Sequence, residues 1–544
     1  MSEAFLRIPP FPGHRAKPLT IAGSAAPSVG SGGELAAQLR AARVGGSFWA
    51  AQPALPVGRD VVLAPANIAQ AEAMAARAKD AGLLDRAVLL AGAPMPPRAG
   101  IPRLAAPCDP WHLARSAAEL WIDADHELAL VAALAGSRLT LFGEGRFTGC
   151  AAAQDDAVSA ALLNNQAYRC PYSGKPISAA EAISLLADWR RLIDANRPVA
   201  AIYGVARWKR VTLDPLLWDG TGPVRHARRV PASSERPVVA WKSRTAPQLL
   251  AALATRGATI AELEDGFVRS AGLGANCVPP LSAIVDFSGV YFDPAGPSDL
   301  EQILEHGDIS HSLCDRAGEL KEHLVHSGVS KYGQTTDQIE RPAGLCRRVL
   351  VTGQVEDDRS VLSGGAGFSN LELIKRARAL EADAWLIYKP HPDVEAGHRK
   401  GHIADQEVLR HVNEIDRKTP ISALLAVVDG LHVITSLAGF EALLRGKPVT
   451  VHGVPFYAGW GLTRDLAAIP PRRSRRRSLD ELVAAALLIY PRYVDPVTRL
   501  PCPAEVVVDR MASGSARVSS PLIRLREIQG RVTLAWQRLT GGRP

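Results

Sequence analysis

From about residue 195 to residue 510, short apolar runs alternate with segments in which apolar residues recur every three or four positions. The runs predict buried strands, and the spacing of three or four predicts helices with one face on a core. Predicted strands cover 199–203, 238–241, 284–292, 349–352, 385–388 and 432–435, and predicted helices cover 247–255, 298–306, 371–382, 421–428 and 440–445. This alternation indicates βαβ units and parallel sheets. The polar stretch 333–342 interrupts it, which predicts one α/β domain on each side.

The first 190 residues are rich in Ala and Pro and contain an imperfect copy of a later segment. Residues 126–143 align without a gap on residues 436–453, and a second match places 157–168 on 482–493. The N-terminal copy has His126 in place of Ser436 and Val131 in place of Glu441. This predicts half of a duplicated module that keeps its fold and has lost its chemistry. The alternative is chance similarity between helices rich in Ala and Leu.

Length and charge restrict the classes of protein that fit. A chain of 544 residues suggests three units of roughly 150 residues. The net charge of +8 suits an anionic partner, and much of the excess lies in residues 472–477 and in the last 30 residues. No stripe of basic residues interleaved with aromatics is evident, so nucleic acid is not an expected partner.

Cysteines and apolar runs exclude further classes. The seven cysteines are widely spaced and form no CxxC pair, so neither a disulfide framework nor a zinc site is expected, and no acidic cluster predicts another metal. The N-terminus has no basic segment followed by an apolar one, and no apolar run approaches 18 residues. We therefore expect a cytoplasmic protein without a spanning segment.

The string Tyr388-Lys-Pro-His-Pro392 closes an apolar strand. In doubly wound folds, ligands bind beyond the carboxyl ends of strands, and the two prolines restrict the turn. Lys389 would bring a positive charge, and His391 an imidazole donor, to a phosphate that gains charge as it leaves. The string predicts a phosphate site. The alternative is a rigid turn with a solvated lysine.

The string Thr435-Ser-Leu-Ala-Gly-Phe-Glu441 lies at the end of the predicted strand 432–435 and begins a predicted helix. Hydroxyls and backbone N–H groups at such a point can hold an anion, and Glu441 could accept hydrogen bonds from a ribose. The alternative is simple capping by Ser436. Two further segments could approach phosphate or sugar. They are the loop after the predicted strand 349–352, Gly353-Gln-Val-Glu-Asp-Asp358, and the Gly-rich stretch Ser363-Gly-Gly-Ala-Gly-Phe-Ser369.

Acidic groups occur in Glu264-Asp-Gly-Phe-Val-Arg-Ser270, at the end of a predicted strand in the preceding domain. One of the two carboxylates could act as base or nucleophile, while its neighbour and Arg269 adjust its pKa. The alternative is an Asp-Gly turn stabilised by arginine. Asp286 and Asp293 are further acid candidates that could equally stabilise turns.

These strings together resemble those of the KpsC/LipA-type capsule polysaccharide β-Kdo transferases. Further matching text is Cys170-Pro-Tyr-Ser-Gly-Lys-Pro-Ile-Ser178, Asp188-Trp-Arg-Arg191, Pro297-Ser-Asp-Leu-Glu301 and the specific string Pro455-Phe-Tyr-Ala-Gly-Trp-Gly-Leu-Thr463. The order and spacing agree from about residue 120 to residue 510. The complete module of this chain is most similar to the C-terminal module of the two-module enzymes.

The resemblance implies an α/β fold of the GT-B type, with two Rossmann-like domains facing a cleft, and CMP-Kdo as donor with no cofactor. It implies retention of configuration through a covalent glycosyl–carboxylate intermediate, with Asp265 as the expected catalytic carboxylate. Glu264 and Asp286 remain further catalytic candidates, and which carboxylate is the nucleophile stays open. The implied donor site comprises Lys389, His391, Pro392, Ser436, Leu437, Glu441, Gln354, Glu356 and Arg269.

The expected organisation is a degenerate partial module over 1–169, an acceptor-side domain over 170–342, a donor-side domain over 343–510 and a basic tail over 511–544. Implied partners are CMP-Kdo, a lipid-linked acceptor, the inner face of the cytoplasmic membrane and other capsule assembly proteins. In the tail, apolar residues from Leu522 to Leu539 recur every three or four positions between arginines, which predicts an amphipathic helix on an anionic membrane or on a domain core. Other readings are a transferase for another CMP-linked ulosonic acid and a silent capsule-assembly scaffold.

Overall fold

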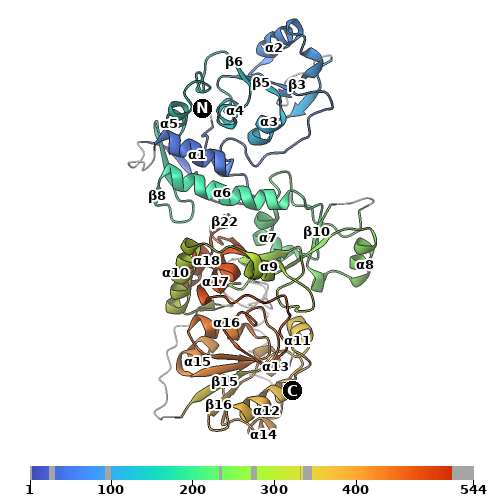
Figure 1. Cartoon of the computed structure of the whole chain (residues 1–544), viewed down its shortest axis with the longest axis vertical. Helices are drawn as coiled ribbons and strands as arrows, with labels where there is room; N and C mark the ends of the chain where they lie inside the picture. The colour runs from blue at the N-terminus through green and yellow to red at the C-terminus, as the bar shows by residue number, and fades with distance from the viewer. Residues whose placement is uncertain are drawn as a thin grey trace, which may run out of the picture. The chain divides into compact units, whose positions relative to one another are not determined.

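The computed structural model describes residues 3–23, 31–91, 100–231, 236–270, 278–330, 333–334, 346–397 and 399–516 (Figure 1). The chain divides into two compact units. Unit 1 comprises residues 1–199 with 217–224 and 498–500, and unit 2 comprises the rest. The apolar pattern from Leu522 onward lies outside the described residues. None of the described helices has the length and apolar character needed to cross a membrane.

Unit 1 contains a parallel sheet of five strands in the order β4-β3-β2-β5-β6. Its strands are β2 (Val61–Ala64), β3 (Ala87–Ala91), β4 (Arg103–Ala105), β5 (Glu119–Asp123) and β6 (Leu139–Phe142). Its helices are α2 (Ile68–Asp80), α3 (Pro110–Ser116) and α4 (Glu127–Ala135). A second sheet joins β1 (Thr20–Ala22), β7 (Gln166–Arg169) and β8 (Pro176–Ile177), beside α1 (Gly32–Ala42), α5 (Gln154–Leu162) and α6 (Ala179–Asn196).

Unit 2 contains two six-stranded sheets. The sheet of the expected acceptor-side domain has the order β22-β21-β12-β11-β10-β9; neighbouring strands pair in parallel from β9 to β11, and the remaining pairs are antiparallel. Its strands are β9 (Ile202–Tyr203), β10 (Val238–Ala240), β11 (Ile260–Asp265), β12 (Ser282–Asp286), β21 (Arg492–Val494) and β22 (Pro501–Cys502). Its helices are α7 (Arg210–Leu217), α8 (Pro247–Thr255), α9 (Asp299–His306), α10 (His311–Ser327), α17 (Leu479–Val483) and α18 (Ala504–Ala512).

The donor-side sheet has the order β17-β16-β15-β18-β19-β20 with every pair parallel. Its strands are β15 (Arg348–Thr352), β16 (Trp385–Lys389), β17 (Glu414–Ile415), β18 (Gly430–Val433), β19 (Val449–Val451) and β20 (Arg464–Asp465). Its helices are α11 (Arg359–Gly364), α12 (Asn370–Leu380), α13 (Pro392–Glu395), α14 (Asp405–Val408), α15 (Ile421–Val427) and α16 (Leu437–Leu444), of which α12 and α15 both contact β15 (Figure 1).

The predicted α/β class with parallel sheets is confirmed, and each predicted helix has a counterpart. The predicted strand 284–292 is too long, because β12 ends at Asp286. The Asp286 carboxylate accepts the N–H groups of Ser288 and Gly289 at 3.0 and 2.8 Å. These two hydrogen bonds turn the chain away from the sheet, so the apolar residues that follow belong to a loop.

The internal repeat extends further in the structure than in the sequence. His126 and Ser436 each cap a helix, accepting an N–H two residues ahead at 3.1 and 3.2 Å. In the second match, the Tyr168 hydroxyl donates to the Leu162 carbonyl at 2.8 Å, and the Tyr493 hydroxyl donates to the Leu487 carbonyl at 2.9 Å. The β7–β8 and β21–β22 pairs also share one register, with a proline beginning the second strand of each. Chance similarity does not explain matched caps, bonds and registers.

Residues 170–199 pack with the N-terminal unit, whereas the sequence placed a boundary at residue 170. Helix α6 lies against α1, and its buried Arg190 forms an ion pair of 2.8 Å with the fully buried Asp109. Arg190 also donates to the Arg43 and Phe48 carbonyls. The Asp188-Trp-Arg-Arg191 string therefore stabilises unit 1, because its central residues Trp189 and Arg190 lie in that core.

The arginine run 472–477 is largely committed to internal contacts. Arg473 is buried and forms a 2.7 Å ion pair with Glu301, which Arg472 also contacts. Arg477 is buried and donates to the Leu304 carbonyl at 2.6 Å. The prediction of a charged surface for anionic partners does not hold for these three side chains, since they bind protein groups.

Candidate active site

The carboxyl ends of the parallel strands β9, β10 and β11 gather charged side chains from three separate segments. Asp265 and Glu264 end β11, Lys242 follows β10, and Lys209 lies in the short turn after β9. Parallel strands end at one edge of a sheet, which is where ligands bind in open α/β folds. The structure thus confirms that Glu264 and Asp265 end a strand and adds two lysines beside them.

Asp265 faces two cations. Its Oδ2 lies 2.5 Å from Arg269 Nε, and its Oδ1 lies 3.5 Å from Lys209 Nζ. Arg269 is buried and also donates to the Ser270 hydroxyl at 2.9 Å. Both cations stabilise negative charge on Asp265. Arg269 therefore pairs with the acidic motif, as both the catalytic interpretation and the turn alternative predicted. Its place in the donor site, which the resemblance implied, stays a prediction.

Gly266 explains how the chain turns after Asp265. A Cβ atom at this position would lie 2.3 Å from the Ser282 hydroxyl oxygen, a distance that real contacts do not show. The Gly266 N–H also donates to the Ser282 carbonyl at 3.1 Å. A side chain here would push the end of β11 away from β12 and displace the neighbouring carboxylate. The glycine is thus required by close packing.

Glu264 has a raised pKa, of about 7. Burial is the main cause, and the charges of Asp265 and Glu262 add to it, while Arg359 and Lys209 oppose it. Glu262 lies two residues earlier on the same strand, so both side chains share one face of the sheet. Glu262 is buried between Lys242 at 2.9 Å and Arg359 at 2.6 Å.

Arg359 comes from α11 of the donor-side domain and also lies 3.6 Å from Glu264. It connects the two Rossmann-like domains of unit 2 at the acidic strand. Sequence reasoning missed Glu262, Lys242, Lys209 and Arg359. The alternation of Glu262 and Glu264 along a strand was a usable signal, whereas the three cations come from distant segments and had none.

Asp286 has the geometry of a structural carboxylate. It is fully buried, and besides Ser288 and Gly289 it accepts the Asp299 N–H at about 3 Å and the Tyr490 hydroxyl at 2.6 Å. Burial raises its pKa, although the Tyr490 hydrogen bond opposes that shift. Asp293 accepts the Ala295 N–H at 3.0 Å in a turn. For both residues the structure supports the turn alternative over a catalytic role.

The Lys389–Pro392 turn lies at the carboxyl end of β16. His391 caps α13, and its Nδ1 accepts the Asp393 N–H at 3.2 Å. A neutral ring that accepts at Nδ1 carries its proton on Nε2, so Nε2 is a donor. Lys389 is half-buried, and burial lowers its pKa while the nearby Asp416 charge opposes the shift. Pro392 is the first residue of α13, where a proline fits without loss of a hydrogen bond.

The Ser436 turn follows β18, which pairs with β15 on the side opposite β16. Gln354 joins these strand ends, because its amide donates to the Thr435 hydroxyl at 3.0 Å and accepts the Thr435 N–H at 2.8 Å. Ser436 and Leu437 are partly exposed at the start of α16, and Glu441 lies one turn later. The structure therefore brings the Lys389–Pro392 turn, Gln354 and Ser436 to one sheet edge.

Gln354 and Glu356, which were predicted to contact the donor, have protein partners in the structure. Glu356 accepts the Asn370 N–H at 2.8 Å, at the start of α12, and Gln354 is buried between Thr435 and Asn370. Within the Gly-rich stretch, the Gly364 carbonyl accepts the Val454 N–H at 2.8 Å, and a Cβ on Gly453 would lie 2.4 Å from that carbonyl oxygen. These residues shape the sheet edge, and their glycines serve backbone packing.

An aromatic cluster joins the acidic motif to the donor side. Phe267, which follows Asp265 and Gly266, lies with its ring centroid 4.5 Å from Phe456 and 6.2 Å from Phe440. Phe456 belongs to the 455–463 string and Phe440 to the Ser436 helix. The Tyr457 hydroxyl then donates to the Ser436 carbonyl at 2.5 Å. The cluster therefore holds these three strings in one packed arrangement within unit 2.

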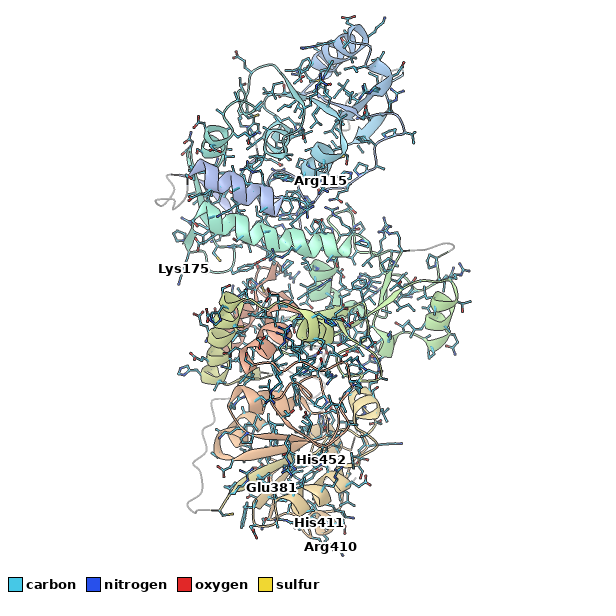
Figure 2. All side chains as sticks on the ribbon, in the orientation of Figure 1. Arg115, Lys175, Glu381, Arg410, His411 and His452 are labelled. Atoms are coloured by element: carbon cyan, nitrogen blue, oxygen red, sulfur yellow. The ribbon has the colours of Figure 1, made fainter. Side chains whose placement is uncertain are left out.

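Buried histidines lie elsewhere in the donor-side domain. His432 Nδ1 and His452 Nε2 are 3.0 Å apart, and His432 Nε2 lies 3.5 Å from the Glu381 carboxylate. Figure 2 labels Glu381 and His452. Burial lowers the pKa of both rings, that of His452 to about 3, so both are neutral near pH 7. By sheet register the same two positions in unit 1 carry the aromatic pair Trp121 and Phe142. The pair is a packing feature of this domain type.

Among the described residues, the copy in unit 1 differs from the donor-side copy at the predicted phosphate-binding positions. By register, Leu90 on β3 occupies the position of Lys389 on β16, and it is buried. Glu127 occupies the position of Leu437, where its charge repels an anion from the start of α4. Arg7 pairs with Glu127 at 2.8 Å, and the Ser47 N–H donates to it at 2.7 Å.

We predict that His126→Ala leaves transfer rates within about twofold, because Leu90 stands where the predicted phosphate site has Lys389. Loss of the cap should lower stability by about 1 kcal/mol. Steady-state rates and thermal unfolding of the purified variant measure the two effects separately. A large rate loss in a folded variant would mean that unit 1 carries a second active site.

Comparisons with known proteins agree with this geometry. The model of the family described as capsule polysaccharide biosynthesis protein matches residues 236–332 and 310–493. A solved chain of Thermosulfurimonas dismutans KpsC, titled beta Kdo 2,4 transferase, is 33% identical, with a TM-score of 0.50 over 57% of this chain and 98% of that chain. The chain belongs to the KpsC/LipA-type family of capsule polysaccharide proteins. Its fold is that of the family's transferase module.

Two curated relatives of the KpsC/LipA family extend the match. The capsule polysaccharide modification protein LipA of Neisseria meningitidis serogroup A is 37% identical over 355 residues, which are 64% of this chain and 50% of LipA. The lipopolysaccharide-processing protein LpsZ of Rhizobium meliloti is 45% identical over 236 residues, which are 42% of this chain and 53% of LpsZ. The chain thus spans about half the length of the curated relatives that it matches.

Proposed function

We propose that this chain is a retaining β-Kdo glycosyltransferase that transfers Kdo from CMP-Kdo to a lipid-linked Kdo acceptor during synthesis of a capsular polysaccharide linker. The observation that carries the proposal is the Glu264–Asp265 pair at the carboxyl ends of β9 to β11, set among four cations. Support comes from the likeness of this module to the KpsC chain titled as a β-Kdo transferase.

The reaction proceeds in two displacements. An Asp265 oxygen bonds to the anomeric carbon of the donor sugar while the bond from that carbon to the phosphate oxygen breaks, and CMP leaves with the electron pair. Lys389 and His391 stabilise the charge that develops on the phosphate. An acceptor hydroxyl then loses its proton, attacks the same carbon and releases Asp265. Two inversions leave the configuration unchanged.

The two carboxylates suit different roles because their surroundings differ. Asp265 lies between Arg269 and Lys209, which favour its charged form, and a charged carboxylate is the better nucleophile. Glu264 has a pKa of about 7, so it can exchange a proton with the acceptor hydroxyl near neutral pH. Pairs of titratable groups with divergent environments commonly divide acid–base work in this way.

A donor screen tests the proposal. The purified protein is incubated with CMP-Kdo, CMP-sialic acid or UDP-sugars and a synthetic lipid acceptor that ends in Kdo, and products are detected by mass spectrometry. We expect transfer from CMP-Kdo. Transfer from a different CMP-linked ulosonic acid would favour that related transferase, and no transfer from any donor by a folded protein would favour the capsule-assembly scaffold.

The remaining partners are also part of the proposal. A lipid-linked acceptor requires the enzyme to reach the inner face of the cytoplasmic membrane from the cytoplasm. The basic amphipathic pattern from Leu522 onward has the composition that binds an anionic lipid surface. The proposed catalyst needs no metal or other cofactor, and capsule assembly proteins are its expected neighbours.

A further inference from the structure

Lys209 reaches Asp265 from a segment that is distant in sequence. It ends the short helical turn Arg207–Lys209 that follows β9 and leads into α7. The Lys209 N–H donates to the Ala206 carbonyl at 3.0 Å, and the Lys209 carbonyl accepts the Thr212 hydroxyl at 3.1 Å. These contacts fix the backbone from which the side chain extends over the sheet edge.

The Lys209 ammonium sits on an aromatic face. Its Nζ lies 3.2 Å from the centroid of the buried Trp241 ring and 5.4 Å from that of Trp208. The side chain is only 12% exposed. A cation held over an indole face and shielded from water keeps its position and is weakly screened, so it acts strongly on a carboxylate 3.5 Å away.

Charged and aromatic groups from three segments surround Lys209. Asp265 and Glu264 at the end of β11 favour its protonated form, Arg269 in the following loop opposes it, and Trp241 after β10 contributes its ring face. Burial outweighs the two carboxylates and lowers the Lys209 pKa to about 8. Below that pH the amine is charged, and as the pH rises through about 8 the charge is lost.

We propose that Lys209 is a positioning residue for the transfer reaction, which holds the Asp265 carboxylate ionised and oriented through its Oδ1 while Arg269 holds Oδ2. The proposal rests on the proposed function, in which Asp265 attacks the donor sugar. The two cations hold different oxygens: Arg269 is buried and lies against Oδ2, whereas Lys209 is held over the Trp241 ring and lies against Oδ1, which is itself buried. Loss of the lysine charge therefore removes the cation that lies 3.5 Å from Oδ1.

Lys209→Met and Lys209→Arg test this role through the pH dependence of transfer from CMP-Kdo. The wild-type rate should decline as the pH rises through about 8. Lys209→Met should lose about tenfold in rate at pH 7, the equivalent of one pKa unit of stabilisation. The guanidinium in Lys209→Arg stays protonated over this pH range. When each enzyme's rates are scaled to its own maximal rate, the decline of Lys209→Arg should therefore begin at least about one pH unit higher than that of the wild type.

Two matched variants identify the source of the decline. Lys242→Met removes a lysine that pairs with Glu262 instead of Asp265, and Glu264→Gln removes the other group that titrates near neutral pH. Lys242→Met should keep the position of the alkaline decline. Glu264→Gln removes a charge that favours protonated Lys209, so it should keep an alkaline decline but move it to lower pH. The proposal is overturned if the rate of Lys209→Arg declines at the same pH as that of the wild type. It is also overturned if Lys209→Met keeps the wild-type rate at pH 7. Should Lys209→Met fail to fold, the Lys209→Arg profile decides alone.

The proposed function fails separately. Wild-type transfer by Asp265→Asn rejects Asp265 as the attacking group whatever the lysine variants do. An inactive Asp265→Asn enzyme together with unaffected Lys209 variants rejects only the positioning role.

Discussion

Asp265→Asn is expected to abolish transfer, with a rate loss of at least about 10⁴-fold, while CMP still binds. The amide keeps the shape of the side chain but cannot form a stable ester with the sugar, so the first displacement is lost. CMP binding should persist because the phosphate-binding turn, Lys389 to Pro392, belongs to the donor-side sheet. Rates and isothermal calorimetry with CMP measure the two properties independently.

The Asp265→Asn variant should also be less stable, because it leaves the buried Arg269 without its anionic partner. Thermal unfolding therefore accompanies the assay, and Asp293→Asn provides a control, since Asp293 lies in a turn and should change the rate by less than about twofold. CMP binding lost together with activity would make Asp265 a structural residue. An active variant would exclude it as the nucleophile.

The sheet class and the position of the main strings could be predicted because each depends on local pattern. An apolar run before Lys389 and a Ser at the start of an apolar helix mark strand ends and helix starts whatever the rest of the chain does. The Asp286 role could not be predicted, since a carboxylate before Ser and Gly has the same sequence in a turn and in a catalytic loop. Only the four donors around it, Tyr490 among them, separate the two.

The charged surroundings of Asp265 were out of reach for a different reason. Lys209 and Arg359 lie 56 and 94 residues from it along the chain, and only strand order and domain packing bring them to β11. Similarly, the repeat in unit 1 was visible where helices keep small apolar residues. It was missed over β8 and β22, because each strand has only two residues and they share only the first, a proline.

The two copies differ at the proposed phosphate site. Both copies have a helix cap after the strand equivalent to β18, but Lys389, the cation that we propose for the phosphate site at the end of β16, corresponds to Leu90 in unit 1. In unit 1, Glu127 places a negative charge at the start of α4, and this carboxylate forms an ion pair with Arg7 of the same unit. We therefore expect the Lys389–His391 turn, and not the cap or the helix N-terminus alone, to provide the phosphate site.

His391→Ala is expected to lower the transfer rate about 10²-fold, equivalent to about 3 kcal/mol in the barrier, with little change in the KM for donor. The Nδ1 atom accepts the Asp393 N–H, which leaves Nε2 as the protonated nitrogen that can donate to the phosphate. Such a donor gains strength as charge develops on the leaving group, so its loss affects kcat more than ground-state binding.

The cap that His391 provides for α13 complicates a simple alanine substitution, because removing it costs about 0.5–2 kcal/mol of stability. His391→Asn is the matched control, since asparagine is a good cap but lacks the imidazole. We expect both variants to lose the same rate, whereas only the alanine variant unfolds at lower temperature. If the asparagine variant instead regained wild-type turnover, the histidine would serve the shape of the turn, and the leaving phosphate would have to be stabilised by Lys389 and the Ser436 helix.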